Sequence, residues 1–310
     1  MMPVARHSAG MTDATVDLRG LWVPIITPLV TGGEVDWAAL DQLARRLLAD
    51  GCAGLVALGT TGEPATLDLA EREAVIEACA VACAEADRPL IVGVGSSCTR
   101  STIDEARRVE ALVGPAALLV VVPWYTRPSE AAVVAHLRAV ASAVSTPLVI
   151  YNIPHRTGRG LGADAILELA QLPQVVGLKQ SVEALDRDTL EILRRRPDHF
   201  QVLAGDDTYI VPTVLMGGAG AIAAAGHVCT PRFVAMIDAA LGHDSRGAAA
   251  LAHSLLPLVD AGFAEPNPAG WKAALHGLGE IGSPDLRPPM TSASAETTAA
   301  LLDAIAAIDA

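Results

Sequence analysis

The feature that most constrains this chain is a regular alternation of short apolar runs with longer amphipathic segments. Several runs are continuous in Val, Ile, Leu, Ala and Gly, which is typical of strands covered on both faces. Strands that alternate with helical segments predict a parallel sheet joined by crossover helices. Eight strands are expected, at residues 21–29, 54–59, 89–95, 117–124, 147–153, 175–180, 201–206 and 220–226.

The segments between these runs carry the signals of helices. Asp36, Asp68 and Ser129 each precede an amphipathic stretch, and such residues are favoured as N-caps because their side-chain oxygens accept hydrogen bonds from the first helical turn. Eight strand–helix units in this order predict an α/β fold, the (βα)8 TIM barrel. At 310 residues the chain has a length that such barrels form as one domain.

More helical stretches follow the eighth unit and predict a C-terminal helical extension. They lie near residues 245–262, 267–278 and 293–308. The extension could pack on the barrel or on a neighbouring subunit. We therefore predict a disordered or ragged N-terminal segment at 1–18, the barrel core at 19–230, and the last barrel helix with the extension at 231–310.

The charge and composition of the chain limit the partners and the cellular location that can be expected. The chain has 22 Lys and Arg against 35 Asp and Glu, a formal charge of −13, so no nucleic acid and no membrane is expected as a partner. No signal-peptide core and no unbroken apolar stretch of membrane-spanning length is visible. The five cysteines form no C-x-x-C pair and do not resemble a disulfide framework. We expect a cytoplasmic protein with reduced thiols.

Lys179 ends the sixth apolar run, Val-Val-Gly-Leu-Lys-Gln at 175–180. Burying an ammonium group is costly unless it is paired or loses its proton, and a deprotonated lysine is a nucleophile. One interpretation is a lysine whose stem lies on apolar surface while its amine reaches water. The other is an imine-forming lysine. The chemistry of such barrels gathers at the carboxyl ends of the strands, so the position of Lys179 is compatible with both interpretations.

Other polar segments also follow predicted strands. Gly-Thr-Thr-Gly-Glu follows the second strand and Tyr-Asn-Ile-Pro-His-Arg-Thr-Gly follows the fifth. The full set is Gly59–Glu63, Pro123–Pro128, Tyr151–Pro154, Arg156–Gly158, Gly177–Lys179, Gly205–Asp207, Glu265–Pro268 and Lys272. In this order the segments resemble the dihydrodipicolinate synthase family of pyruvate-dependent class I lyases, over roughly residues 20–295.

The resemblance implies a Schiff-base mechanism centred on Lys179. Its amine would attack the keto carbon of pyruvate, and the resulting imine would act as an electron sink. Loss of a methyl proton then gives an enamine, which adds to the aldehyde of L-aspartate 4-semialdehyde. The implied product is 4-hydroxy-tetrahydrodipicolinate, an intermediate of diaminopimelate and lysine biosynthesis.

The resemblance also assigns the proton transfers to three hydroxyl groups. Tyr151 is the implied central donor and acceptor, and Thr60 connects it to Tyr125. Tyr125 is implied to reach across an interface into the neighbouring active site. The family likeness therefore suggests a homotetramer built as a dimer of dimers.

Five residues are implied to bind the substrates. The turn that holds Thr61 and Gly62 would present backbone N–H groups to the pyruvate carboxylate, because glycine permits close approach. Arg156 can hold the carboxylate of the semialdehyde with two parallel hydrogen bonds. Gly205 and Ile222 match positions whose backbone carbonyls line the pocket. A surface salt bridge is the alternative interpretation of Arg156.

The chain departs from the family pattern at several positions. Gln180-Ser181-Val182 stands where an acidic residue and a small polar turn are usual, which loosens the substrate assignment. Trp124 replaces a first tyrosine and His227 a common asparagine. Ser101 replaces an acid that would pair with the amine of lysine bound as an inhibitor, so weak or no inhibition by lysine is expected.

Two rival functions remain open. One is another pyruvate-dependent class I aldolase, acting on a 2-keto-3-deoxy sugar acid or on 4-hydroxy-2-oxoglutarate. The other is a non-catalytic barrel that binds a keto acid. No cofactor and no metal are expected, because the chain has no dinucleotide-binding or phosphate-binding glycine motif, and its eight histidines form no H-E-x-x-H arrangement.

Overall fold

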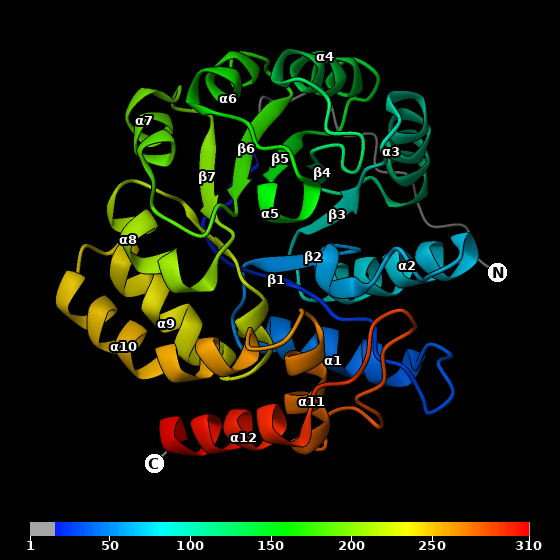
Figure 1. Ribbon diagram of the computed structural model, residues 1–310, viewed down its shortest axis with the longest axis vertical. Coiled ribbons are helices and arrows are strands. Elements are labelled where there is room, and N and C mark those ends of the chain that lie inside the picture. The colour runs from blue at the N-terminus through cyan, green and yellow to red at the C-terminus, as the bar shows by residue number, and fades with distance from the viewer. Residues whose placement is uncertain (1–15, 310) are drawn as a thin grey trace.

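The computed structural model describes residues 16–309, which contain one closed barrel (Figure 1). Its strands pair in chain order from β1 to β8, β8 closes on β1, and every pairing is parallel. The predicted TIM barrel is confirmed. The strands are β1 Gly20–Pro24, β2 Gly54–Ala57, β3 Leu90–Val94, β4 Ala117–Val121, β5 Leu148–Asn152, β6 Val175–Gln180, β7 Gln201–Ala204 and β8 Gly220–Ile222.

Helices surround the strands and form the outer layer of the molecule (Figure 1). The α-helices are α1 Trp37–Ala49, α2 Leu69–Glu85, α3 Thr99–Val113, α4 Glu130–Ala141, α5 Pro154–Thr157, α6 Ala163–Leu169, α7 Arg187–Arg195, α8 Ile210–Leu215, α9 Thr230–Leu241, α10 Ser245–Gly262, α11 Ala269–Gly277 and α12 Ala295–Asp309. The 3-10 turns are η1 Thr60–Gly62, η2 Asp207–Tyr209 and η3 Ala224–His227.

The predicted N-caps are confirmed. Asp36 Oδ1 accepts a hydrogen bond from the Ala39 N–H at 3.0 Å, and Ser129 Oγ accepts one from the first turn of α4 at 3.3 Å. Asp68 and Glu71 form a reciprocal capping box, with hydrogen bonds of 2.8 and 2.9 Å between each side chain and the other residue's N–H. These local bonds explain why the three helices begin where the sequence indicates.

Two strands end four or more residues earlier than predicted. The apolar runs at 21–29 and 220–226 continue, but strand pairing stops at Pro24 and Ile222. After β8 the chain turns into η3, where an N–H donates to the buried Asp207 carboxylate at 2.7 Å instead of to a neighbouring strand. Apolar sequence therefore extends beyond the sheet because the loops at this end are buried as well.

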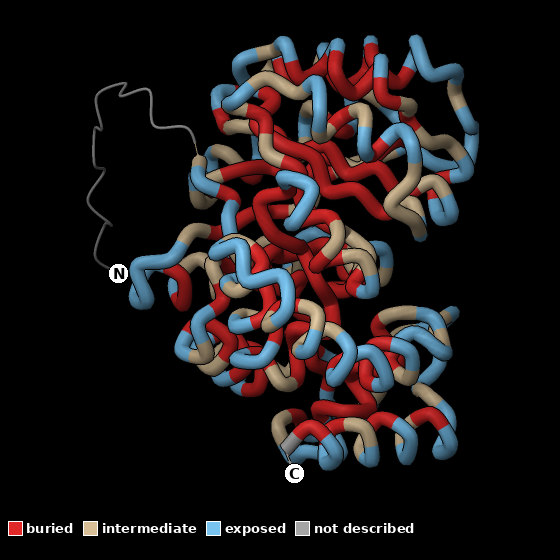
Figure 2. Tube along the Cα trace, turned by 90° about the vertical axis from the view of Figure 1, so that its left-hand side faces the viewer, coloured by how far each residue is buried: buried red, intermediate tan, exposed pale blue. Residues whose placement is uncertain are grey.

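The core has two parts. One cluster fills the inside of the barrel and includes Trp22, whose Nε1 donates to Leu18 O at 2.9 Å. A larger cluster lies between the strands and the surrounding helices. In Figure 2 buried chain runs through the centre and exposed segments lie outside. Most of the predicted N-terminal segment 1–18 lies outside the described residues, although Leu18 is fully buried.

The predicted C-terminal extension is helical. α10 packs against α9, and α12 packs against both α10 and α11. Figure 1 shows these helices gathered at one side of the barrel. Within residues 16–309, no helix has the length and apolar character needed to cross a bilayer.

Candidate active site

A cavity of about 790 Å³ lies at the carboxyl ends of the strands, where the barrel fold concentrates functional side chains. Segments far apart in the chain form its wall, from β1 to the loop after α10. The structure brings six of the predicted site residues to this cavity. They are Thr61, Tyr151, Arg156, Lys179, Gly205 and Ile222.

Lys179 is buried inside the barrel and does not extend to bulk water. It lies on β6 opposite Tyr151 on β5, and each residue is 5% exposed. The Lys179 Nζ lies 4.3 Å from the centroid of the Tyr151 ring. Within the described part of the chain, Nζ makes no hydrogen bond and no ion pair. The geometry therefore contradicts a surface-reaching lysine and leaves an accessible amine on the cavity wall.

Two carboxyl groups lie near this amine, on Asp206 and Asp207. Burial raises the pKa of Asp206, although the Glu183 N–H donates to it. Burial raises the pKa of Asp207 to about 7, despite a hydrogen bond from the Ala225 N–H and the nearby positive charge of Lys179. The cavity therefore contains a group, the Asp207 carboxyl, whose protonation changes near neutral pH.

Asp207 should make stability depend on pH. Between pH 4 and 7 the folded chain retains a proton on Asp207 that the unfolded chain releases, so its contribution to the free energy of unfolding falls as pH rises. Asp207→Asn removes this contribution and still accepts the Ala225 hydrogen bond. Thermal denaturation should show the variant gaining stability relative to the parent between pH 5 and pH 8. Parallel melting temperatures across that range would contradict the assignment.

The structure brings together two of the three hydroxyl groups of the predicted relay. Thr60 Oγ1 and the Tyr151 hydroxyl are 3.4 Å apart, within hydrogen-bond reach. Tyr125, in contrast, is 89% exposed and does not line the cavity. Its φ of 69° places it in the left-handed region, in the loop after β4. A single chain therefore does not bring Tyr125 to Tyr151.

A second cavity, of about 450 Å³, lies beside the first. It is lined by Thr60, Trp124 and Tyr151, so Tyr151 faces both cavities. Trp124 therefore contributes to a wall next to the relay.

His227 does not line either cavity. It is fully buried, its Nε2 accepts a hydrogen bond from the Ile26 N–H at 3.0 Å, and burial lowers its pKa to about 4.

The turn after β2 is held by the elements around it. Gly62 O accepts from Thr27 Oγ1 at 2.8 Å, and Thr61 Oγ1 accepts from Asn267 Nδ2 at 3.0 Å. The Gly62 N–H already donates to Gly59 O at 2.9 Å. This internal bond weakens the prediction that Gly62 presents its N–H to a carboxylate, and it leaves Thr61 as the better placed of the two.

Arg156 stands in the short helix α5, where Pro154 occupies the first turn. The residue is exposed and lines both cavities. Among the described residues it forms no ion pair. The surface salt bridge considered for Arg156 is therefore absent from this part of the chain, and the guanidinium is available to a ligand carboxylate.

Gly205 and Ile222 form the wall beside the lysine. Ile222 is 1% exposed at the end of β8. A Cβ on Gly205 would overlap Ser181 Oγ and approach Lys179 Cγ to 3.0 Å. The close approach of the chain after β7 to the end of β6 therefore requires glycine at this position.

Some residues that line the cavity were not predicted from the sequence as site residues. Ser181 appeared only as a departure from the family pattern, and Phe263 and Asn267 come from the C-terminal extension. Phe263 packs edge-to-face on Trp271 with ring centroids 5.3 Å apart. The apolar periodicity of a helix does not distinguish a residue at a cavity from a residue in the core, so no sequence signal identified Phe263.

The C-terminal extension is linked to the turn after β2 by a buried ion pair. Lys272 Nζ pairs with Glu63 Oε1 and donates to Asp285 O at 2.9 Å. Lys272 and Glu63 are 0% and 7% exposed, and burial lowers the pKa of Lys272 while Glu63 opposes that shift. Glu63 directly follows η1, so this pair connects α11 to the turn that carries Thr60 and Thr61.

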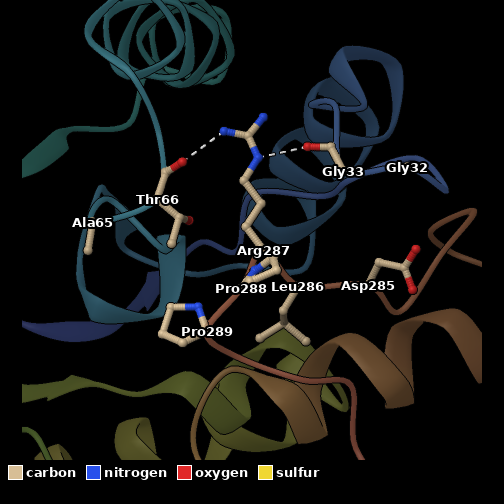
Figure 3. Close-up of a pocket in the computed structure, with 9 residues that line it drawn as sticks. All are labelled: Gly32, Gly33, Ala65, Thr66, Asp285, Leu286, Arg287, Pro288 and Pro289. Carbon is tan, nitrogen blue, oxygen red and sulfur yellow. Dashed lines mark hydrogen bonds between the residues drawn. The ribbon is translucent and has the colours of Figure 1, made fainter.

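Arg287 adds a second link, shown in Figure 3. Its guanidinium donates to Gly33 O at 2.7 Å, to Thr66 O at 2.9 Å, and to both carboxylate oxygens of Glu71. The pocket drawn there, about 670 Å³, lies at the surface between the loop after β1 and residues 285–289. Because these acceptors occupy its guanidinium, we interpret Arg287 as structural.

Comparison with known proteins agrees with this geometry. The model of the dihydrodipicolinate synthetase family matches residues 17–308. The chain belongs to this family. A 4-hydroxy-tetrahydrodipicolinate synthase of Moorella thermoacetica is 38% identical over 273 residues, which are 88% of this chain and 92% of that protein. The synthase of Haloarcula marismortui is 36% identical over 294 residues, 95% of each chain.

Solved structures of the family have the same fold. The dihydrodipicolinate synthase of Acinetobacter baumannii, in a chloride-inhibited form complexed with pyruvate, superposes with a TM-score of 0.90 at 30% identity. The match covers 94% of this chain and 99% of that chain. The family resemblance inferred from the sequence segments is confirmed.

Proposed function

We propose that this dihydrodipicolinate synthetase family member is a Schiff-base-forming lyase that condenses pyruvate with L-aspartate 4-semialdehyde to 4-hydroxy-tetrahydrodipicolinate. The observation that carries the proposal is the buried Lys179 amine on the face of Tyr151, at the wall of a cavity. The names of the curated relatives support the substrates and product. The other aldolase reactions and the non-catalytic barrel are not favoured by these relatives.

The chemistry begins when Lys179 Nζ attacks the keto carbon of pyruvate and the resulting carbinolamine loses water to form an imine. The protonated imine withdraws electrons from the methyl group, and Tyr151 with Thr60 accepts the methyl proton. The enamine carbon then bonds to the aldehyde carbon, whose oxygen takes up a proton. Attack of the substrate amine on the imine carbon closes the ring and expels the lysine amine.

The substrate carboxylates are assigned to opposite sides of the cavity. Thr61 would hold the pyruvate carboxylate through its hydroxyl and backbone N–H, with Gly62 shaping the turn. Arg156 would hold the semialdehyde carboxylate with paired hydrogen bonds, supported by its exposure to the cavity. Gly205 and Ile222 would place their backbone carbonyls near the imine.

The proposal includes a homotetramer, as a dimer of dimers, and a cytoplasmic location. Tyr125 is exposed on the loop after β4 beside Trp124, which is also exposed. Large exposed aromatic residues are enriched at protein interfaces. In a dimer, Tyr125 would complete the relay in the active site of the neighbouring subunit, so an isolated subunit would be poorly active.

Tyr151→Phe should separate imine formation from proton transfer. The variant keeps the ring under Lys179 and loses the hydroxyl, so kcat should fall about 10²- to 10⁴-fold, as expected for loss of general acid–base catalysis. Borohydride should still trap pyruvate on Lys179. Tyr209→Phe is the matched control, because Tyr209 lines the same cavity, and its kcat should change less than about threefold. Equal loss in both variants would contradict the relay.

Lysine should inhibit this enzyme weakly or not at all. Ser101 and Pro64 stand where the family would supply polar or ionisable contacts for the inhibitor. A neutral hydroxyl group holds an ammonium group more weakly than a carboxylate does. A lysine titration of the initial rate should therefore leave most activity at millimolar lysine. Strong inhibition at sub-millimolar concentration would contradict this expectation.

Two coupled assays test the proposed reaction directly. One supplies pyruvate with aspartate semialdehyde and follows formation of the cyclic product. The other supplies a panel of 2-keto-3-deoxy sugar acids and 4-hydroxy-2-oxoglutarate and follows release of pyruvate. We expect turnover in the first assay to exceed that in the second by at least an order of magnitude. Preferential release of pyruvate from a hydroxy keto acid would overturn the assignment.

A further inference from the structure

The wall of the active-site cavity contains a buried hydroxyl group that has no hydrogen-bond partner among residues 16–309. Ser181 follows Lys179 by two residues along the direction of β6, so its side chain points to the same side, one layer nearer the mouth. Ser181 is 1% exposed and lines the cavity. Its Oγ has no hydrogen-bond partner in the part of the chain that the structure describes. Because buried polar groups nearly always have one, this hydroxyl indicates a ligand.

The backbone holds this serine in place from both sides. The Ser181 N–H donates to Asn152 O at 2.9 Å, and the Gly205 N–H donates to Gln180 O at 2.8 Å. The side-chain amide of Gln180 is fixed on the outer face of β6. Its Oε1 accepts from Asn152 Nδ2 at 2.9 Å, and its Nε2 donates to Thr189 Oγ1 at 3.0 Å. Gly205 has no side chain, which leaves the space that Ser181 Oγ occupies. The hydroxyl is therefore preorganised.

Charged side chains lie on both sides of the Ser181 hydroxyl. The barrel places β5, β6 and β7 side by side, so Arg156 after β5 and Asp206 after β7 lie on either side of Ser181. The Glu183 backbone N–H donates to Asp206 Oδ2 at 2.6 Å. The Glu183 side chain points elsewhere, with its Oε1 4.0 Å from His155 Nδ1. The Glu183 carboxylate is therefore near α5, which also carries Arg156. After β5, β6 and β7, in the order of the strands, the mouth presents the Arg156 guanidinium, the Ser181 hydroxyl and the Asp206 carboxyl group.

This order fits a small zwitterion. A molecule whose carboxylate is held by Arg156 would direct an ammonium group on the adjacent carbon toward Ser181 and the Asp206 carboxyl group beyond it. A serine hydroxyl accepts a hydrogen bond from an ammonium group, and an ionised Asp206 carboxylate favours a cation at that point. The first substrate, a keto acid held at Lys179, has no such group.

We propose that Ser181 Oγ accepts a hydrogen bond from the α-ammonium group of the aldehyde substrate. Ser181 is then a specificity-determining residue, and the site selects an α-amino-acid aldehyde over the same aldehyde without the amino group. This inference rests on the proposed function, since it assumes that an aldehyde enters after pyruvate has bound to Lys179.

The test compares Ser181→Ala with the parent enzyme on two aldehydes, aspartate semialdehyde and succinate semialdehyde, which lacks the amino group. Succinate semialdehyde cannot close the ring, so its aldol adduct leaves Lys179 by hydrolysis of the imine. The rate is therefore followed for both substrates as consumption of the aldehyde. A hydrogen bond to a charged group is worth roughly tenfold or more in affinity. Ser181→Ala should therefore lose about tenfold in kcat/KM for aspartate semialdehyde and less than about twofold for succinate semialdehyde. Borohydride trapping of pyruvate and the KM for pyruvate should not change.

Two control variants test whether the expected loss is specific to the Ser181 hydroxyl. Ser283→Ala removes the hydroxyl of another buried serine, which does not line the cavity, and should leave both rates unchanged. Ser181→Cys preserves the volume with a weaker acceptor and should show a smaller, still selective loss if the alanine variant folds poorly. Equal losses on both aldehydes, or none on either, would overturn the inference. Failure of the parent enzyme to trap pyruvate would instead overturn the proposed function, and this inference with it.

Discussion

Replacing Lys179 with alanine should abolish turnover while the barrel still folds. The covalent route passes through this amine, so kcat/KM should fall by about 10⁴-fold or more. Removing the amine also removes a buried polar group that has no hydrogen bond or ion pair within the described residues. We therefore expect the melting temperature to stay within a few degrees of the parent value. Circular dichroism and the coupled assay check the two expectations separately.

A matched control distinguishes loss of the amine from loss of packing. Lys179→Met keeps most of the side-chain volume beside Tyr151 but has no nucleophile, so its activity should be as low as that of Lys179→Ala. Substantial activity in either variant would show that another group carries the reaction. Added primary amines could also be tested for partial rescue of the alanine variant, which would identify the missing group as the amine.

Breaking the buried Lys272–Glu63 ion pair should cost the most stability of any single substitution considered. Lys272→Met leaves the Glu63 carboxylate buried without its cation, and removing one partner of such a pair typically costs about 3–5 kcal/mol. The melting temperature should therefore fall by roughly 6–20 °C. The turn that carries Thr60 and Thr61 adjoins Glu63, so kcat should fall as well.

Two further variants test that explanation. Combining Lys272→Met with Glu63→Gln removes the uncompensated charge and should recover a substantial part of the lost stability. Arg138→Met breaks the exposed pair between Arg138 and Glu168, and should cost less than about 1 kcal/mol. If Lys272→Met were as mild as Arg138→Met, the pair would not anchor the extension to the active site.

Local signals in the sequence were sufficient to predict the barrel. The strand at 175–180 has its predicted bounds, and the caps at Asp36 and Asp68 lie where expected. The rule that chemistry gathers at the carboxyl ends of strands then places Lys179 and Tyr151 in one cavity. Periodicity and capping act over a few residues, so they can be inferred from the chain alone.

Contacts between distant segments could not be predicted in this way. No local pattern pairs Lys272 with Glu63 or directs Asn267 to Thr61, because those contacts depend on how the extension docks on the barrel. Likewise, the internal hydrogen bond of the Gly62 N–H depends on the turn conformation. The family resemblance identified these segments as important, and the structure provides the physical reason.

Mapping the site of a trapped pyruvate adduct tests the central claim most directly. The chain contains only two lysines, Lys179 and Lys272, and Lys272 is fully buried in its ion pair. Borohydride reduction in the presence of pyruvate should add about 72 Da, the increment for a reduced imine, to the peptide that contains Lys179. No increment, or an increment on any other amine, would contradict the proposed mechanism.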